Sequence, residues 1–361
     1  IDKLVELAES EVDRTRNDGR FHGLAQMYRD RFVRIRDYWR RYDGDLVHPL
    51  RGLQDAGKLE VITCTATHPF IPFMDRNWAA IRAQVHVAAD VYERAFGRRT
   101  QGMWLGECGY VPGLDELLRE ENIRYFFLDT HGLLFADRRP VYGVHAPIYC
   151  PTGVAAFGRD VPSSRQVWSS KEGYPGDPDY RDFYRDIGFD LPIEYVRPYI
   201  HPDGIRTFTG VKYHAITHGA LHNKNPYVPH VAWQRANAHA QHFLEQREQQ
   251  VRALRPQMDR PPIIVSPYDA ELFGHWWYEG PIFLEMLLRK IHTDQGMIAP
   301  ITPSAYLHAH PTNQVATPAM SSWGAGGYGE YWCNQSNAWI YRHLHKMGER
   351  MVELARRFSQ A

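Results

Sequence analysis

The sequence predicts an α/β protein whose strands form a parallel β-sheet, either as a barrel or as an open sheet. Short apolar runs alternate with stretches of ten or more residues at helical spacing, a pattern typical of βα units. Functional-type side chains lie at or just past the ends of these runs, as they do at the active-site edge of such sheets: His68, Glu107, Asp129, Trp168 and Asp269. A length of 361 residues fits an α/β barrel formed as one unit.

The first half of the chain supplies three strand and three helix predictions. Helical periodicity covers Ile1 to Arg41, with charged residues on one face. Strands are predicted where apolar and β-branched residues cluster, and helices where apolar residues recur every three or four positions. The predicted strands are 59–65, 102–105 and 123–129, and the later helices are 77–96, which Gly97 ends, and 114–121.

The second half predicts strands at 166–169 and 263–267 and a long helix between them at 231–254. Segments 140–162 and 172–202 are predicted loops, and loops of this length are usually functional covers over a site. After Pro318, a loop rich in Trp and Gly leads into a helix from Asn337 to Phe358, expected to pack against the main domain.

Charge and composition narrow the function classes. The 42 basic and 42 acidic side chains cancel, so neither nucleic acid nor an anionic membrane is expected as a partner. The chain has 10 Trp and 21 Tyr residues, many beside Gly, Pro and polar residues. About half of these aromatic side chains are expected to pack in the core, and the others suit a stacking surface for sugar rings.

The four cysteines form no CxxC pair, which favours reduced thiols in a cytoplasmic protein. No apolar stretch approaches the ~18 residues that span a bilayer. Ile1 to Arg16 has the pattern of a charged amphipathic helix and not of a signal peptide. Because the chain starts with Ile in mid-pattern, we expect that an N-terminal portion is absent.

Two carboxylates have surroundings that suit glycoside cleavage, which needs a carboxyl group on each side of the bond. Glu107 lies between glycines that are expected to leave room for a ligand, with Trp104 and Tyr110 as apolar walls. Asp269 lies in an aromatic segment, and such surroundings raise a carboxyl pKa and suit a general acid. Glu271 is its main rival for the acid role. Taken alone, each carboxylate is more often a solvated surface group. The density of Gly, Trp and His around both carboxylates favours an active site instead.

His68 and His275 either contact a sugar hydroxyl or steady the nucleophile, or they are buried, satisfied histidines. The chain has no H-E-x-x-H spacing, and the His308-Ala-His310 segment is expected to be solvent-exposed, so no metal site is predicted. Neither a G-x-S-x-G elbow nor a phosphate-binding glycine loop occurs, which argues against a serine triad and against nucleotide binding.

With these motifs the sequence resembles glycoside hydrolase family 57, and within it the 1,4-α-glucan branching enzymes, over nearly the whole chain. The motifs that carry the resemblance are Ala66-Thr-His68, Trp104-Leu-Gly-Glu107, Gln166 to Gly176, Ser266 to Gly280, and Ser322-Trp-Gly324. The Ser266 to Gly280 block is highly specific, whereas the Thr-His pair alone is weak.

The resemblance implies an incomplete (β/α)7 barrel with a C-terminal helical region, a retaining mechanism, and no metal or organic cofactor. It places an N-terminally incomplete catalytic barrel at 1–310 and the Trp/Gly loop and helical region at 311–361. Glu107 matches the family nucleophile, Asp269 its acid/base, and His68 the histidine of the second motif. The implied glucan-binding aromatics are Trp168, Trp276, Trp323 and Trp332. The predicted substrate-binding set also includes His68, Trp104 and His275.

Two departures from the family pattern stand out. The N-terminal His-x-His-x-Pro motif of the first strand is missing, so that strand is expected to be absent from this chain. The stretch after Glu107 leads almost directly into the helix at Leu114. The subdomain that some members insert there is therefore short or lacking, which leaves the chain-length preference open.

The implied activity is branching: cleavage of an α-1,4-glucan, such as amylose or a glycogen-like chain, and transfer of the fragment to a 6-hydroxyl. An α-amylase or 4-α-glucanotransferase of the same family would differ in the acceptor. Alternatives from other classes are a non-catalytic glucan-binding protein and a metal-dependent polysaccharide deacetylase on a similar barrel. The oligomeric state is not indicated, and a monomer is the default expectation.

Overall fold

The computed structural model describes residues 1–169, 171–217 and 223–359, so Ser170 of the predicted 166–176 motif lies outside the described residues. The chain forms two compact units. The helical unit comprises Ile1–Pro49, Pro162–Val251 and Tyr268–Ala299. The sheet unit comprises Leu50–Val161, Arg252–Pro267 and Pro300–Ala361. The division at residue 310 that the sequence suggests stays a prediction.

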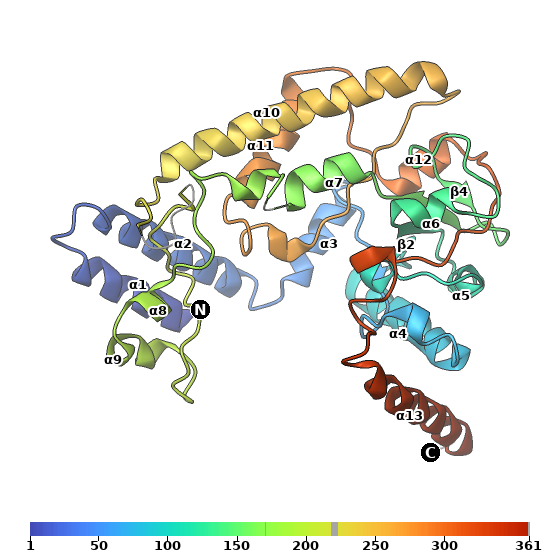
Figure 1. The fold of residues 1–361 in the computed structure, drawn as a ribbon, viewed down its shortest axis with the longest axis horizontal. Helices are drawn as coiled ribbons and strands as arrows, with labels where there is room; N and C mark the ends of the chain where they lie inside the picture. The colour runs from blue at the N-terminus through green and yellow to red at the C-terminus, as the bar shows by residue number, and fades with distance from the viewer. Residues whose placement is uncertain (170, 218–222, 360–361) are drawn as a thin grey trace. The chain divides into compact units, whose positions relative to one another are not determined.

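Within its described residues, the sheet unit holds five strands in the order β1-β2-β3-β5-β4, of which β2 and β4 are labelled in Figure 1. The strands are β1 (Thr63–Cys64), β2 (Gly102–Trp104), β3 (Tyr125–Leu128), β4 (Ile148–Tyr149) and β5 (Ala155–Gly158). The first three and β5 pair in parallel, and β4 pairs with β5 in the antiparallel sense. The predicted α/β class with a parallel sheet is confirmed.

The centre of the sheet is apolar because both of its faces are covered. All four residues of β5 are buried, as are three of the four in β3. A Cβ atom on Gly158 would lie 2.8 Å from the Leu133 side chain, so glycine here allows α6 (Thr130–Leu134) to approach the strand closely.

Helix α4 (Trp78–Phe96) begins and ends where the sequence predicts. The Asn77 side chain accepts a hydrogen bond from the Ala80 N–H at 3.2 Å, which satisfies one of the free donors of the first turn. Gly97 ends the helix with φ of 70°, a left-handed conformation that glycine adopts without strain.

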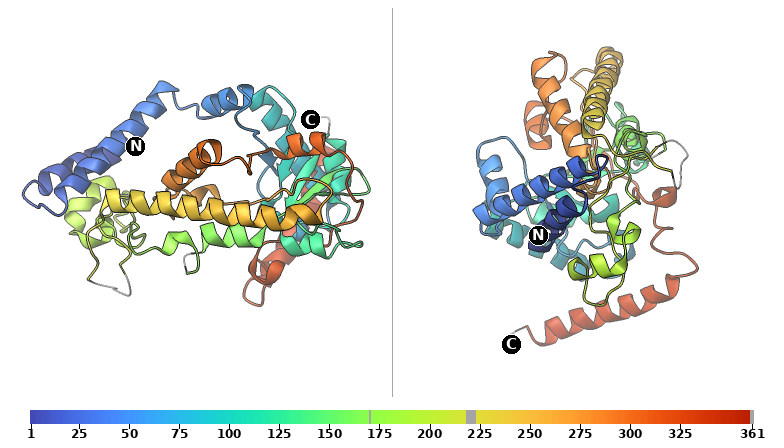
Figure 2. Two further views of the ribbon diagram at one scale, coloured as in Figure 1. Left: turned by 90° about the horizontal axis from the view of Figure 1, so that it is seen from above. Right: turned by 90° about the vertical axis from the view of Figure 1, so that its left-hand side faces the viewer.

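The other helices of the sheet unit are α5 (Leu114–Glu120), α6, α12 (Pro303–Ala309) and α13 (Ala338–Arg357), and α3 (Val47–Asp55) spans its first residues. The predicted C-terminal helix is confirmed as α13, which stands out as a separate rod in the right-hand view of Figure 2. Every residue of α13 is at least partly exposed. His345 Nε2 lies 2.8 Å from the Phe73 carbonyl oxygen and ties the helix to its unit.

The helical unit contains α1 (Asp2–Arg14), α2 (His22–Arg41), α8 (Ile187–Asp190), α9 (Ile193–Val196) and α11 (Gly280–Thr293), and most of α7 (Val161–Trp168) and α10 (Pro229–Leu254). Helices α1 and α2 pack side by side (Figure 1). The core of this unit is rich in aromatic rings, among them Tyr28, Tyr180, Tyr213, Trp277 and Phe283.

Short 3-10 turns occur in both units, at Ile71–Phe73, Gly106–Cys108, Tyr174–Gly176, Arg197–Tyr199, Arg255–Gln257, Ala270–Leu272 and Ala325–Gly327.

The helical periodicity predicted over 1–41 is divided between α1 and α2. The break falls at Asn17-Asp18-Gly19. Asp18 Oδ1 accepts a hydrogen bond from the Arg20 backbone N–H at 3.0 Å, a local bond that competes with helix. Glycine at position 19 weakens a helix further.

The loop predicted at 140–162 is wrong, because this segment contains β4 and β5. Alanine and glycine have low strand propensity, so Ala155-Ala-Phe-Gly158 carries a weak local signal. Its complete burial between neighbouring elements decides the conformation. In the loop predicted at 172–202, α8 and α9 interrupt the irregular backbone, and Tyr174 and Tyr180 belong to the core.

Two predicted strands are wrong. The 166–169 segment is the end of α7, whose buried Ser163, Ser164 and Val167 recur at helical spacing, and Pro162 suits the start of a helix. The 263–267 segment is extended but has no strand assignment. Only scattered backbone bonds hold it, such as Ile263 N–H to the His145 carbonyl at 2.9 Å, because the surrounding prolines remove donors.

Among the described residues, every helix is too short or too polar to serve as a bilayer span.

Candidate active site

Three of the predicted polar residues lie at one edge of the sheet. His68 follows β1, Glu107 follows β2 and Asp129 follows β3. Because these three strands are parallel neighbours, their carboxyl ends share an edge, which is where α/β proteins build active sites. The same expectation is wrong for Trp168, which ends helix α7, and for Asp269, which follows an extended segment without strand pairing.

The Glu107 carboxylate is oriented by one neighbour at each oxygen. The Trp323 indole Nε1–H donates to Oε2 at 2.7 Å, and His68 Nε2 lies 3.5 Å from Oε1. The Trp323 backbone N–H also donates to the Glu107 carbonyl at 2.9 Å. The Glu107 side chain is 34% exposed, so the carboxylate is fixed in direction and still accessible. His68 is 48% exposed, which contradicts its interpretation as a buried histidine.

The backbone at these residues is strained. Glu107, Cys108 and His68 have φ values of 59°, 52° and 53°. The left-handed region is unfavourable for residues with a Cβ atom and costs about 1–3 kcal/mol per residue. Such strain persists only where the surrounding structure holds it, and it concentrates at functional sites.

The glycines beside Glu107 have a different use from the expected one. A Cβ atom on Gly106 would lie 2.7 Å from the Pro69 carbonyl oxygen, and one on Gly109 would lie 2.8 Å from the Pro72 ring. These glycines therefore make room for the segment that follows β1, rather than for a ligand.

Trp323 connects Glu107 to further side chains of the same edge. The Trp104 and Trp323 rings meet edge to face, with centroids 4.8 Å apart. The Arg159 guanidinium lies 5.4 Å from the centre of the Trp323 ring, a cation–π contact, and its Nη1 is 3.5 Å from Asp129 Oδ2. The contacts thus run from Asp129 through Arg159 and Trp323 to the Glu107 carboxylate.

Sequence reasoning did not identify Arg159. It follows β5 directly, and β5 lies in the segment predicted to be a loop. The available signal was the apolar run 154–158 followed by the charged pair Arg159-Asp160, the same arrangement that marks the other strand ends.

The loop that carries Trp323 is fixed to the sheet unit at several points. His131 Nε2 lies 2.5 Å from the Gly327 carbonyl oxygen. Trp332 packs against Phe70 with ring centroids 4.5 Å apart, and a Cβ atom on Gly324 would lie 2.4 Å from the Trp332 ring. Trp332 is therefore a packing residue of this loop, and its predicted contact with glucan stays a prediction.

The remaining predicted residues lie in the helical unit. Asp269 immediately precedes the turn Ala270–Leu272 and is exposed, as is Glu271, so burial does not distinguish the two candidates for the acid role. Trp168 and Trp276 are 56% and 54% exposed, and His275 is exposed as well. The Trp276 ring stacks on Phe183 with centroids 4.6 Å apart. Exposed tryptophans of this kind suit carbohydrate rings.

The described residues hold no group of three His, Cys, Asp or Glu side chains placed to bind a metal ion. In the His308-Ala-His310 segment, His308 is exposed and the His310 ring lies 4.9 Å from that of Tyr306.

An α/β fold that presents an oriented carboxylate among tryptophan rings at the end of a parallel strand is typical of carbohydrate-processing proteins. The family follows from comparison with known proteins: the model of glycosyl hydrolase family 57 matches residues 1–320, and the chain belongs to this family. The predicted resemblance is thereby confirmed.

The similar proteins include branching enzymes and an alpha-amylase. The chain is 32% identical over 360 residues to a 1,4-alpha-glucan branching enzyme of Thermococcus kodakarensis, covering 91% of this chain and 50% of that protein. The structure of the alpha-amylase AmyC of Thermotoga maritima matches with a TM-score of 0.92 and 44% identity, over 100% of this chain and 68% of that one. The structure of a family 57 branching enzyme of Pyrococcus horikoshii matches with a TM-score of 0.84 and 31% identity, over 98% of this chain and 64% of that one.

These likenesses confirm the incomplete-barrel fold class with its C-terminal helical region. The chain spans about half the length of the curated relatives that it matches.

Proposed function

We propose that this protein is a retaining 1,4-α-glucan branching enzyme, with Glu107 as nucleophile and Asp269 as general acid/base. The observation that carries the proposal is the Glu107 carboxylate at the end of β2, oriented by Trp323 and His68 on a strained backbone. Membership of glycosyl hydrolase family 57 supports glycosidase chemistry, and the branching enzymes among the relatives support transfer to a sugar acceptor.

In the first step, a Glu107 oxygen attacks the anomeric carbon of an α-1,4-glucan, and Asp269 gives its proton to the leaving 4-oxygen. The C–O bond breaks, and the donor chain is held as a glycosyl ester of Glu107. Because Trp323 Nε1–H bonds to Oε2, the carboxylate presents a defined oxygen to the sugar.

In the second step, the ionised Asp269 removes the proton of a glucan 6-hydroxyl, whose oxygen attacks the anomeric carbon. The ester breaks, Glu107 is regenerated and an α-1,6 bond forms with net retention. A retaining mechanism in general uses two carboxyl groups about 5–5.5 Å apart.

Aromatic side chains supply the glucan-binding surface in this proposal. Trp104 and Trp323 stand beside Glu107, and Trp168 and Trp276 are exposed in the helical unit. Stacking on these rings favours a sugar acceptor over water, because it holds the acceptor and displaces solvent.

An α-amylase is the second candidate, favoured by the 44% identity and TM-score of 0.92 to the Thermotoga maritima amylase. The same two carboxylates would act, and water would replace the 6-hydroxyl in the second step. A 4-α-glucanotransferase would use a 4-hydroxyl instead.

Incubation with amylose distinguishes these reactions, with α-1,6 linkages measured by proton NMR and released reducing ends measured on the same sample. New α-1,6 signals with few reducing ends establish branching. Reducing ends without α-1,6 signals establish hydrolysis and reject the proposal. Altered chain lengths with neither signal identify a 4-α-glucanotransferase, and unchanged amylose together with glucan binding identifies a binding protein.

A further inference from the structure

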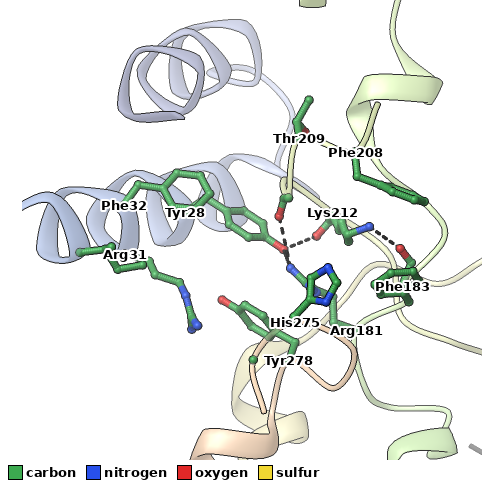
Figure 3. A pocket seen from close by; sticks show the side chains of 13 residues that line it. Tyr28, Arg31, Phe32, Arg181, Phe183, Phe208, Thr209, Lys212, His275 and Tyr278 are labelled. Atoms are coloured by element: carbon green, nitrogen blue, oxygen red, sulfur yellow. Dashed lines mark hydrogen bonds between the residues drawn. The ribbon is translucent and has the colours of Figure 1, made fainter. Parts of the chain in front are cut away.

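The helical unit contains a cavity of about 360 Å³ that the proposed reaction does not use (Figure 3). It is lined from α2, from the segments around Arg181 and Lys212, and from the segment that ends at Tyr278. This volume falls within the range of small-molecule sites.

Two guanidinium groups flank one aromatic ring in the cavity wall. Arg31 and Arg181 place their Cζ atoms 4.5 Å and 4.0 Å from the centre of the Tyr278 ring (Figure 3). Among the described residues, Arg31 has no ion-pair or hydrogen-bond partner. Its positive charge is therefore not balanced by a carboxylate in the part of the chain that the structure describes.

Arg181 is buried, with 8% of its surface exposed, and only part of its guanidinium is satisfied. Nη1 donates to the Tyr28 hydroxyl and to the Gly210 carbonyl, each at 3.2 Å. Nε is buried and has no partner in the described structure. A buried cation without a counter-ion is unfavourable, and an anion in the cavity beside the guanidinium would offset its charge.

The nearby carboxylates are already engaged elsewhere. Lys212, which also lines the cavity, has Asp186 Oδ2 3.4 Å from its Nζ and donates to the Phe183 carbonyl. Glu279 Oε1 accepts the Arg181 backbone N–H at 3.0 Å, and burial raises the pKa of this carboxyl, which weakens it as a counter-ion. The cavity therefore keeps an excess of positive charge.

We propose that this cavity binds a small phosphate-bearing ligand, with Arg31 and Arg181 as the groups that contact the phosphate. Planar guanidinium groups present paired N–H donors that match phosphate oxygens. Phe183 and Phe208 line the same cavity and offer apolar contact to a sugar ring carrying the phosphate. The proposal does not depend on glucan branching.

Isothermal titration calorimetry at fixed ionic strength tests this proposal with four probes: inorganic phosphate, glucose 1-phosphate, glucose and maltohexaose. We expect either phosphate-bearing probe to bind, with the tighter one identifying free phosphate or a sugar ester as the natural class. Glucose should not bind at this site. Arg31→Gln should weaken phosphate binding at least tenfold, and the affinity should fall as salt increases.

Arg34→Gln is the matched control, because Arg34 is an exposed residue of the same helix that does not line the cavity. Arg31→Lys, which keeps the charge and loses the planar fork, should bind with intermediate affinity. Circular dichroism verifies that each variant is folded.

Two results would overturn the proposal: phosphate binding that Arg31→Gln leaves unchanged, or the absence of binding by both phosphate probes. His275 also lines the cavity and is one of the predicted glucan contacts. Maltohexaose that displaces glucose 1-phosphate would therefore assign the cavity to glucan and reject a separate phosphate site. Amylose turnover, measured on the same variants, reports on the proposed function independently.

Discussion

Glu107 combines three features that a surface carboxylate does not need. Its backbone is in the left-handed region, its two oxygens are placed beside Trp323 and His68, and its side chain remains accessible. The orienting Trp323 is itself held by contact with Trp104 and Arg159. An oriented, accessible carboxylate is what nucleophilic attack on an anomeric carbon requires.

Glu107→Gln is expected to lower amylose turnover by about a thousandfold or more, because an amide cannot form the glycosyl ester. The substitution keeps the size of the side chain, so glucan affinity should change little. Turnover and affinity are measured separately, by product formation and by calorimetry. The matched control is Glu116→Gln, an exposed glutamate of α5. Turnover within tenfold of the unaltered protein would rule out Glu107 as nucleophile.

Trp323→Phe is expected to lower kcat by about 10- to 100-fold with little change in KM. The variant keeps an aromatic ring and loses the Nε1–H donor, and a hydrogen bond to a charged group contributes about 1.5–3 kcal/mol. Trp339→Phe, at an exposed position of α13, serves as control. A raised KM with unchanged kcat would instead assign Trp323 to glucan binding.

At the scale of single elements, α4 is set by its two ends. Asn77→Ala should lower the free energy of unfolding by about 1 kcal/mol, because it removes the acceptor for the Ala80 N–H. Asn77→Ser, which restores a capping hydroxyl, should recover most of this loss. Urea unfolding followed by circular dichroism measures both. Equal stability of the alanine and serine variants would show that the cap contributes nothing.

The close contact between β5 and α6 gives a second prediction at this scale. Gly158→Ala places a methyl group 2.8 Å from Leu133 and 2.9 Å from Val144, and such overpacking costs about 1–3 kcal/mol. Gly296→Ala is the control, because the space around that glycine is open. Thermal unfolding compares the two variants. A Gly158→Ala protein as stable as the Gly296→Ala protein would show that the contact relaxes without cost.

At the scale of the whole molecule, half-buried histidines make stability depend on pH. Burial lowers the pKa of His145, His214 and His239 below the ordinary value of 6.5. The unfolded chain therefore binds more protons than the folded one at mildly acidic pH. The stabilisation from these neutral histidines is present above about pH 6.5 and is lost progressively as the pH falls below it.

The midpoint of thermal unfolding should accordingly fall when the pH is lowered from about 7 to about 5. His145→Leu removes one titrating group, and the midpoint of this variant should fall less over the same interval. The midpoint is the appropriate quantity because a chain with two compact units need not unfold in one step. An equal fall in both proteins would show that His145 takes no part.

The sequence alone determined the parts of this protein that depend on local patterns. Periodicity and capping residues located α4, α5, α10 and α13, and apolar runs located β2 and β3, because these elements carry strong signals within their own residues. Glu107 and His68 were identified because they directly follow predicted strands. The motifs around them pointed to glycosyl hydrolase family 57, which the comparisons confirm.

Tertiary structure decided what local patterns leave open. Burial makes Ala155–Gly158 a central strand despite weak propensity, and helical packing makes the 166–168 segment part of α7. The bond from Trp323 to Glu107 joins residues 216 positions apart, and the Arg31–Tyr278–Arg181 cluster likewise joins distant segments. Such contacts form only when remote segments of the chain fold together. Local sequence patterns therefore do not predict them.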